Sequence, residues 1–239
     1  MEKNVILEAL QQGDIELQGQ FLHGSNYTFL AHITYQKYDF QAVYKPTRGE
    51  QPLWDFPTGT LAKREVAAFE VSEALGWELV PPTIYRRKAP AGAGSLQFYV
   101  DHDPRYHYFN FTEEDHQRLR PVALFDLLIN NADRKGSHVL LDRDRHLWLI
   151  DHGICFNVDD KLRTVIWDFA GEPFPPALLA DLQRLIDLLL PGTELYPRLA
   201  RYLRVSEIKA LSRRAQALLA APVYPAVPEE RRAYPWPPV

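Results

Sequence analysis

The sequence predicts an α+β fold in two lobes, an antiparallel strand-rich first part followed by an α-helical second part. Between residues 14 and 100, segments rich in β-branched and aromatic residues alternate with turn signals around one long helical pattern. From residue 112 to 220, helical apolar periods dominate instead. We therefore expect an N-lobe over 1–103, a C-lobe over 104–221 and a Pro-rich tail over 222–239.

The first part begins with a short helix and continues as strands. "DIELQGQFLHGSNYTFLAHI" predicts two strands joined near Gly24, and "FQAVYKP" predicts a third. "TLAKREVAAFEVSEALG" has a helical apolar period and stops at Gly76, a suitable C-cap. "PPTIYRR" and "SLQFYVDH" then predict a further hairpin.

The second part predicts a series of helices. "TEEDHQRLRPVALFDLLINN" is helical with a break at Pro121. Three more helical segments follow, "PPALLADLQRLIDLLL", "TELYPRLARYL" and "SEIKALSRRAQALLAA", with Ser206 as the expected N-cap of the last. The final "VYPAVPEERRAYPWPPV" holds too many prolines for a helix or central strand, so we expect it along the surface.

Composition excludes several classes of protein. The chain of 239 residues has a formal net charge of -4, so no general attraction to nucleic acid is expected. It has no apolar run of membrane-spanning length and no basic amphipathic patch, so stable membrane association is not expected either. Cys155 is the single cysteine, which rules out an intramolecular disulfide and fits a cytoplasmic location.

Two aspartates are expected to meet at one end of a hairpin. "HVLL" and "HLWLI" flank the turn "DRDR", so the chain leaves a point after Asp133, reverses and returns with Asp151. Such a pair suits general base catalysis and divalent-metal binding. His138 begins the outgoing strand and can face the same metal. The alternatives are that Asp133 belongs to a loop ion pair and that His138 packs in a core.

A lysine and a glutamate in the first part form a second candidate pair. Lys45 ends the strand "QAVYKP", and Glu65 lies on an otherwise apolar helix stripe. Since a lone glutamate on such a stripe needs a partner, we expect it to pair with Lys45 and to orient the lysine toward the α and β phosphates of ATP. The alternative is that both charges face solvent.

With these residues in order, the chain resembles the protein-kinase-like fold in its small atypical branch. A strand lysine, a helix glutamate, "NNADRKGSH" and "IDHG" are similar to the pattern of phosphatidylinositol 3-/4-kinase-like proteins and HipA-type bacterial kinases. The chain looks most similar to an uncharacterised bacterial group of that superfamily. The resemblance covers about the first 155 residues.

The resemblance implies a role for each of the four charged residues. Asp133 would accept the proton of the attacking hydroxyl, and Asp151 would bind the metal that bridges the ATP phosphates. Lys45, held by Glu65, would contact the α and β phosphates.

The resemblance also implies a nucleotide-binding backbone at two places. The turn at Gly24, Ser25 and Asn26 would cover the phosphates. The segment near Val100 and Asp101 would supply the hinge that reads the adenine edge.

Three departures from the family pattern bear on the chemistry. His138 stands where the family usually has Asn, which favours Mn²⁺ or Zn²⁺ over Mg²⁺ and leaves the choice between Mg²⁺ and Mn²⁺ open. The turn keeps the single Gly24. Lys135 stands where many relatives have His, and an amine there can stabilise charge on the transferring phosphoryl group, which makes it a second catalytic candidate.

The function expected from these patterns is an ATP- and divalent-metal-dependent phosphotransferase acting on a hydroxyl group. Its substrate is unidentified and can be a small molecule, a lipid head group or a protein; Lys161 and Arg163 are candidates to receive an anionic substrate or are solvated loop residues. Two alternatives remain open. One is a nucleotidyl transferase on the same fold, and the other is a pseudokinase that binds nucleotide or acts as a scaffold.

Overall fold

The structure is a computed structural model that describes residues 1–21 and 26–239. Its strands are β1 (Asp14–Gln20), β2 (Phe29–Tyr35), β3 (Tyr38–Pro46), β4 (Thr83–Arg86), β5 (Gly94–Phe98), β6 (Val139–Leu141) and β7 (Leu147–Leu149). Its α-helices are α1 (Lys3–Gln12), α2 (Leu61–Leu75), α3 (Glu113–Gln117), α4 (Arg120–Ile129), α5 (Pro176–Leu188), α6 (Leu195–Leu199) and α7 (Val205–Ala220). Short 3-10 turns are η1 (Thr47–Gly49), η2 (Tyr108–Asn110) and η3 (Gly136–His138). None of the described helices is long and apolar enough to cross a membrane.

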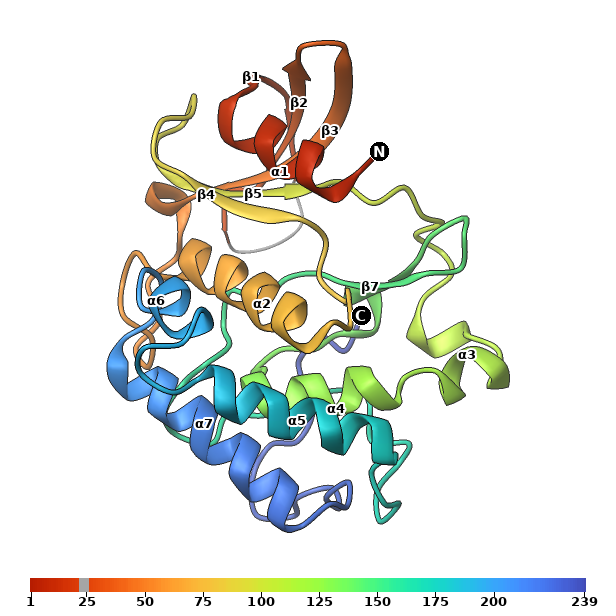
Figure 1. Ribbon diagram of the computed structural model, residues 1–239. Helices are drawn as coiled ribbons and strands as arrows, with labels where there is room; N and C mark the ends of the chain where they lie inside the picture. The colour runs from red at the N-terminus through yellow and green to blue at the C-terminus, as the bar shows by residue number, and fades with distance from the viewer. Residues whose placement is uncertain (22–25) are drawn as a thin grey trace.

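The sheet of the first part is antiparallel throughout. Its strand order is β1-β2-β3-β5-β4, and β6 and β7 form a separate two-stranded sheet (Figure 1). Since side chains alternate along a strand, Ala42 and Tyr44 of β3 face the core under α1, whereas Val43 and Lys45 face the opposite side. The predicted α+β fold is confirmed.

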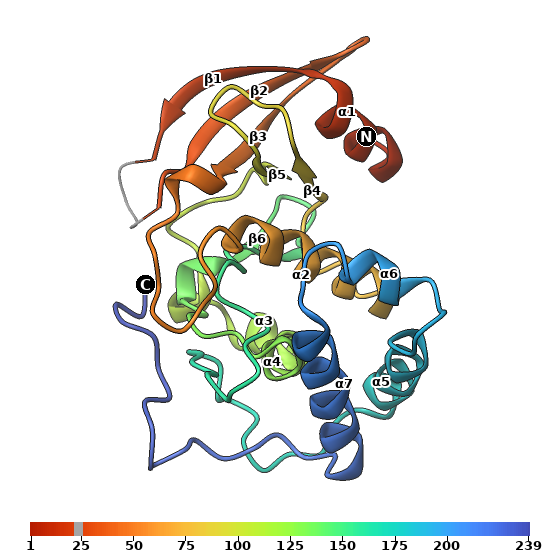
Figure 2. The ribbon, with the colours of Figure 1, turned by 90° about the vertical axis from the view of Figure 1, so that its left-hand side faces the viewer.

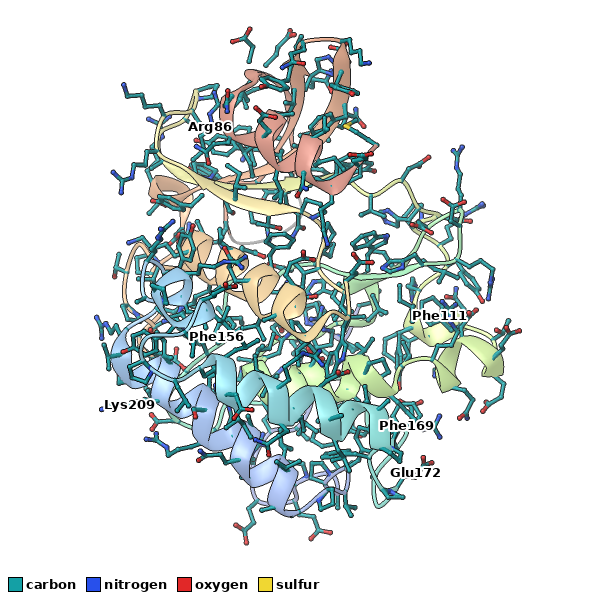
Figure 3. All side chains as sticks on the ribbon, in the orientation of Figure 1. Arg86, Phe111, Phe156, Phe169, Glu172 and Lys209 are labelled. Atoms are coloured by element: carbon teal, nitrogen blue, oxygen red, sulfur yellow. The ribbon has the colours of Figure 1, made fainter. Side chains whose placement is uncertain are left out.

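Helix α1 is tied to the far edge of the same sheet. Arg86 at the end of β4 donates to the carbonyls of Leu10 and Gly13 at 3.1 and 2.6 Å. Figure 3 labels Arg86, which lies near α1. These bonds satisfy carbonyl groups at the C-terminal end of a helix, which have no partner within it.

Helix α2 lies between the sheet and the helices of the second part (Figures 1 and 2). It contacts β4 and β5 on one side and α5 and α6 on the other, so most of its surface is buried. It ends at Gly76, whose φ of 70° is the left-handed conformation expected of a glycine C-cap. The prediction for this helix is confirmed.

The interruption of the next helical segment comes just before Pro121. Helix α3 ends at Gln117 and α4 begins at Arg120, so the proline occupies the first turn, where a missing N–H breaks no helical bond. Two residues of a later segment hold the start of α4: the Arg120 guanidinium stacks on the Phe169 ring at 4.5 Å and pairs with Glu172 at 2.7 Å. Figure 3 labels Phe169 and Glu172.

The predicted N-cap of α7 is wrong. The helix begins at Val205, so Ser206 lies inside its first turn. Arg204 is the cap residue, and its backbone N–H donates to the Glu207 carboxylate at 2.8 Å. The side chain of the glutamate three residues after the cap thus accepts from the cap's own backbone N–H, which is one half of a capping box.

The Pro-rich tail runs beside the helical part, from the end of α7 up to the level of β6 (Figure 2). It has no helix, and backbone hydrogen bonds fix it at several points. The carbonyls of Tyr224, Ala233 and Pro238 accept from Gly171, Thr164 and Gly136 at 2.9, 3.1 and 2.8 Å. The tail thus reaches the loop that carries Asp133.

Candidate active site

A cleft of about 540 Å³ lies between the sheet and the helical part. Val43 and Phe98 of the sheet line it from one side, and Leu140 and Ile150 of the β6–β7 hairpin line it from the other. Lys45, Glu65, Asp133, Lys135, His138 and Asp151 line the same cleft. Apolar walls with a group of charged side chains at one place are typical of a small-molecule site.

Lys45 holds two carboxylates together. Its Nζ lies 2.5 Å from Oε1 of Glu65 and 2.9 Å from Oδ1 of Asp151. Burial alone would lower the pKa of this ammonium, but the charges of Asp151 and Glu65 outweigh burial and hold the pKa well above its usual value. The charge of Lys45 in turn holds the pKa of Asp151 well below its usual range. Both groups are therefore ionised at neutral pH.

Asp133 is placed by its own loop. Its backbone N–H donates to the Asn131 side chain at 3.0 Å, and its carboxylate lies 3.6 Å from Nζ of Lys135. Burial, reinforced by the nearby charge of Asp151, raises the pKa of Asp133 to about 6, although Lys135 opposes the shift. A carboxylate whose pKa is raised toward neutrality is suited to act as a general base.

His138 faces Asp151 from the start of β6. Its Nε2 lies 3.5 Å from the Asp151 carboxylate, and its Nδ1 lies 3.4 Å from the backbone N–H of Lys135. Burial lowers the pKa of His138 to about 4, so the ring is neutral at pH 7. A neutral ring that accepts at Nδ1 carries its proton on Nε2. Metal binding through Nε2 therefore requires the proton to move to Nδ1.

The donor set fits a divalent ion only in part. Within residues 1–21 and 26–239, no group of three or more His, Cys, Asp or Glu side chains is arranged to hold a metal. Asp151 and His138 offer one ligand each. Mg²⁺ and similar ions in nucleotide sites commonly take one or two protein ligands and receive the rest from phosphate oxygens and water. The two residues are compatible with such a shared ion.

Comparison with known proteins places the chain in a family. No family model matches it. It is 41% identical over 263 aligned residues to protein Rv2133c of Mycobacterium tuberculosis, with 95% of this chain and 93% of that protein covered. The chain belongs to the Rv2133c family.

Matches to plant enzymes cover a smaller region. The chain is 32% identical over 175 residues to phosphatidylinositol 4-kinase gamma 4 of Oryza sativa subsp. japonica, and 25% identical over 182 residues to its namesake in Arabidopsis thaliana. Each match covers 62% of this chain but only 31% and 32% of the plant proteins. The chain therefore corresponds to about a third of each plant protein.

Similarity to solved structures shows that this chain has a kinase-like fold. A Golgi casein kinase with Mn and ADP bound superposes with a TM-score of 0.61 at 16% identity, over 99% of this chain and 80% of that one. A hydra Fam20 with sugar superposes with a TM-score of 0.55 at 16% identity, over 90% of this chain and 86% of that one. The Helicobacter pylori kinase CtkA superposes with a TM-score of 0.51 at 11% identity, over 90% of this chain and 94% of that one. The expected kinase-like fold is confirmed, whereas membership of the phosphatidylinositol 3-/4-kinase-like superfamily and the relation to HipA-type kinases stay predictions.

Two segments of this member of the Rv2133c family were expected to bind the nucleotide through their backbone, and the structure describes them only in part. Gly24 and Ser25 lie outside the described residues. Asn26 lines the cleft, and its side-chain oxygen accepts from the backbone N–H of Gln51 at 2.7 Å. Val100 also lines the cleft, whereas the Asp101 carboxylate pairs with Arg143 in the β6–β7 turn at 2.7 Å.

A buried ion pair behind the cleft was not predicted. Arg134 Nε donates to both oxygens of Asp126 at 3.1 Å, and both side chains are fully buried. Arg134 also donates to the carbonyl of Ile150 at 2.9 Å and to His152 Nε2 at 2.9 Å. The pair thus joins the Asp133 loop to the Asp151 loop. The one sequence signal for it is an aspartate within the apolar helix "ALFDLLI".

The two residues proposed for anionic substrates lie in different settings. Lys161 pairs with Asp55 at 3.3 Å and stacks over the Trp54 ring at 4.7 Å. Arg163 lies close enough to Asp133 for its charge to oppose the rise in the pKa of that carboxyl. Arg163 is therefore the better placed of the two to meet a substrate at Asp133.

Proposed function

We propose that this protein is an ATP- and divalent-metal-dependent phosphotransferase that moves the γ-phosphoryl group of ATP to a hydroxyl group. The observation that carries the proposal is the position of Lys45 between Glu65 and Asp151, in the cleft that Asp133 also lines. Together, the four charged groups can provide phosphate binding, metal binding and a base. The relatives known as kinases support the same reading.

Each residue has one role in the proposed reaction. The ammonium of Lys45, fixed by Glu65, binds the α and β phosphates. Asp133 accepts the proton of the acceptor hydroxyl as its oxygen bonds to the γ-phosphorus, while the bond from that phosphorus to the β–γ bridging oxygen breaks and ADP leaves. Lys135, 3.6 Å from Asp133, stabilises the charge on the transferring group. A divalent ion on Asp151, with His138 as a second candidate ligand, would neutralise charge on the phosphate oxygens.

The adenine is proposed to lie between the apolar walls of the cleft, beside the backbone of Tyr99 and Val100. The domain division follows from this proposal: an N-lobe over 1–103 that carries Lys45 and Glu65, a C-lobe over 104–221 that carries the two aspartates, and a tail over 222–239. The acceptor is a hydroxyl of a small molecule, a lipid head group or a protein. The match to phosphatidylinositol 4-kinases makes a phosphorylated or otherwise anionic alcohol the first class to screen.

Calorimetric titration with ATP tests the proposal. Wild type is expected to bind ATP in the presence of Mg²⁺ or Mn²⁺, and Asp151→Asn to weaken that binding by at least about tenfold, because it removes the charged metal ligand. Asp39→Asn, at an exposed position near the start of β3, is the control and should bind as wild type does. Absence of ATP binding with every metal would contradict the proposal.

A further inference from the structure

A second cavity of about 600 Å³ lies in the helical part, away from the ATP cleft. It is bounded by α7, by the segment from Val158 to Trp167 and by the tail. Its walls combine apolar side chains, among them Leu127, Trp167 and Leu218, with the three arginines Arg213, Arg214 and Arg231.

The tail that lines one side of this open cavity is fixed in place. Arg231 donates to the carbonyl of Leu162 and pairs with Asp160 at 3.0 Å. At the start of the tail, the carbonyl of Pro222 accepts from the backbone N–H of Phe174 at 2.9 Å. The cavity is therefore enclosed by ordered chain on several sides.

Arg214 carries a charge that its surroundings do not balance. Its Nε and Nη1 donate to the carbonyls of Leu128 and Asn157 at 2.8 and 3.1 Å. Its Nη2 has no hydrogen-bond partner among the residues that the structure describes. Burial lowers the pKa of Arg214 to about 10, and the carboxylate of Asp160 offsets only part of that shift. A half-buried guanidinium bonded only to neutral carbonyls, with one buried N–H group left without a partner, is costly unless an anion approaches it.

The remaining groups around the cavity point to the same kind of ligand. Trp167 Nε1 is a second buried donor without a partner in the described part of the chain. Of the three arginines, Arg231 is balanced by Asp160, whereas Arg213 adds an exposed positive charge on the same side as Arg214. The cavity thus offers an excess of positive charge next to apolar surface.

We propose that this cavity is a second ligand site that binds a small organic anion, with its phosphate or carboxylate group at Arg213 and Arg214 and its apolar part against Trp167 and Leu218. Arginine suits either anionic group because its planar N–H donors match both geometries. The apolar walls require more than a free inorganic ion, since burying apolar surface supplies the rest of the affinity. The site is independent of the proposed phosphotransfer.

Titration with 1-naphthyl phosphate and with 1-naphthoate tests the proposal and separates the two anionic groups. Wild type is expected to bind at least one of them more tightly than it binds inorganic phosphate or 1-naphthol. Ala217→Trp, which fills the cavity from an exposed position on α7, should abolish binding, whereas the neighbouring Gln216→Trp should not. Arg213→Gln should weaken binding roughly tenfold to a hundredfold, since a charged hydrogen bond to the anion is lost.

The variants also separate this cavity from the ATP cleft. Lys45→Met alters the cleft and should leave naphthyl phosphate binding unchanged. Arg214→Gln loses two hydrogen bonds to carbonyls and can destabilise the fold, so the test depends on Arg213 and Ala217 instead. The proposal is overturned if neither probe binds, if inorganic phosphate binds as tightly, or if binding survives Ala217→Trp and is lost with Lys45→Met.

Discussion

The carboxylate of Glu65 accepts a hydrogen bond from the backbone N–H of His152 at 2.9 Å, which ties α2 directly to the segment that follows Asp151. Its other oxygen accepts from Lys45 at 2.5 Å. One buried side chain therefore fixes both a strand of the sheet and the loop of the helical part. Any shift of α2 would move Lys45 and Asp151 relative to each other, so Glu65 sets the geometry of the phosphate end of the cleft.

Removing Lys45 or Glu65 should weaken ATP binding through the same interaction. We expect Lys45→Met to lower the affinity about tenfold to a hundredfold, because a charged contact to phosphate is lost. Glu65→Gln should lower it less, and the double variant should be no weaker than Lys45→Met, since residues in direct contact act non-additively. Calorimetric titration with ATP measures all three. Lys37→Met, on the exposed β2–β3 turn, is the control, and purely additive losses would contradict the coupling.

The raised pKa of Asp133, about 6, predicts a pH dependence of turnover. Only the ionised carboxylate accepts a proton, so the rate should fall as pH decreases through 6, by roughly fivefold to tenfold between pH 7 and pH 5. His138, with a pKa of about 4, stays neutral over this range and does not contribute to the fall. Asp133→Asn should be slow and nearly independent of pH. A flat wild-type profile between pH 5 and 7 would show that Asp133 is not the base.

His138→Asn tests the choice of metal. An imidazole nitrogen favours Mn²⁺ over Mg²⁺ more than an amide oxygen does, so the ratio of activity with Mn²⁺ to activity with Mg²⁺ should fall about tenfold in the variant. His32→Asn in β2, a half-buried histidine that pairs with Asp39 at 3.2 Å, serves as the control. An unchanged ratio would mean that His138 is a neighbour of the metal position and does not bind it.

Breaking the buried pair of Asp126 and Arg134 should be costly to stability. Arg134→Met leaves a fully buried carboxylate without its charge partner, and we expect a loss of about 3–5 kcal/mol in the free energy of unfolding. The double variant Asp126→Leu, Arg134→Met should lose less than the sum of the single losses. Urea unfolding monitored by circular dichroism measures each value. Losses below 1 kcal/mol would show that the pair contributes little.

Much of the cleft could be predicted because local patterns determine it. The period-2 pattern of β3 places Lys45 on the face opposite α1, and the apolar stripe of α2 leaves Glu65 as a buried charge in need of a partner. The short hairpin of β6 and β7 brings the loops of Asp133 and Asp151 to the same cleft. Each inference needs only one or two adjacent elements.

Other contacts could not be predicted because they depend on segments far apart in the chain. Glu207 of α7 pairs with Arg64 of α2, which lies more than a hundred residues earlier in the chain. The bond from Gly136 to Pro238 joins the Asp133 loop to the tail, and no periodicity indicates it. The unbalanced positive charge of Arg214 likewise becomes visible only in the folded structure, where α7, α4 and the tail come together.

The central claim is that Asp133 and Asp151 support phosphoryl transfer from ATP. Its most direct test is to incubate the purified protein with ATP and Mg²⁺ or Mn²⁺ and to identify the products chromatographically, for wild type, Asp133→Asn and Asp151→Asn. The account predicts slow metal-dependent formation of ADP, with water or the protein itself as acceptor, that both substitutions reduce by at least about a hundredfold. Release of AMP and pyrophosphate would contradict it in favour of nucleotidyl transfer. ATP binding without any turnover would contradict it in favour of a nucleotide-binding module that does not catalyse.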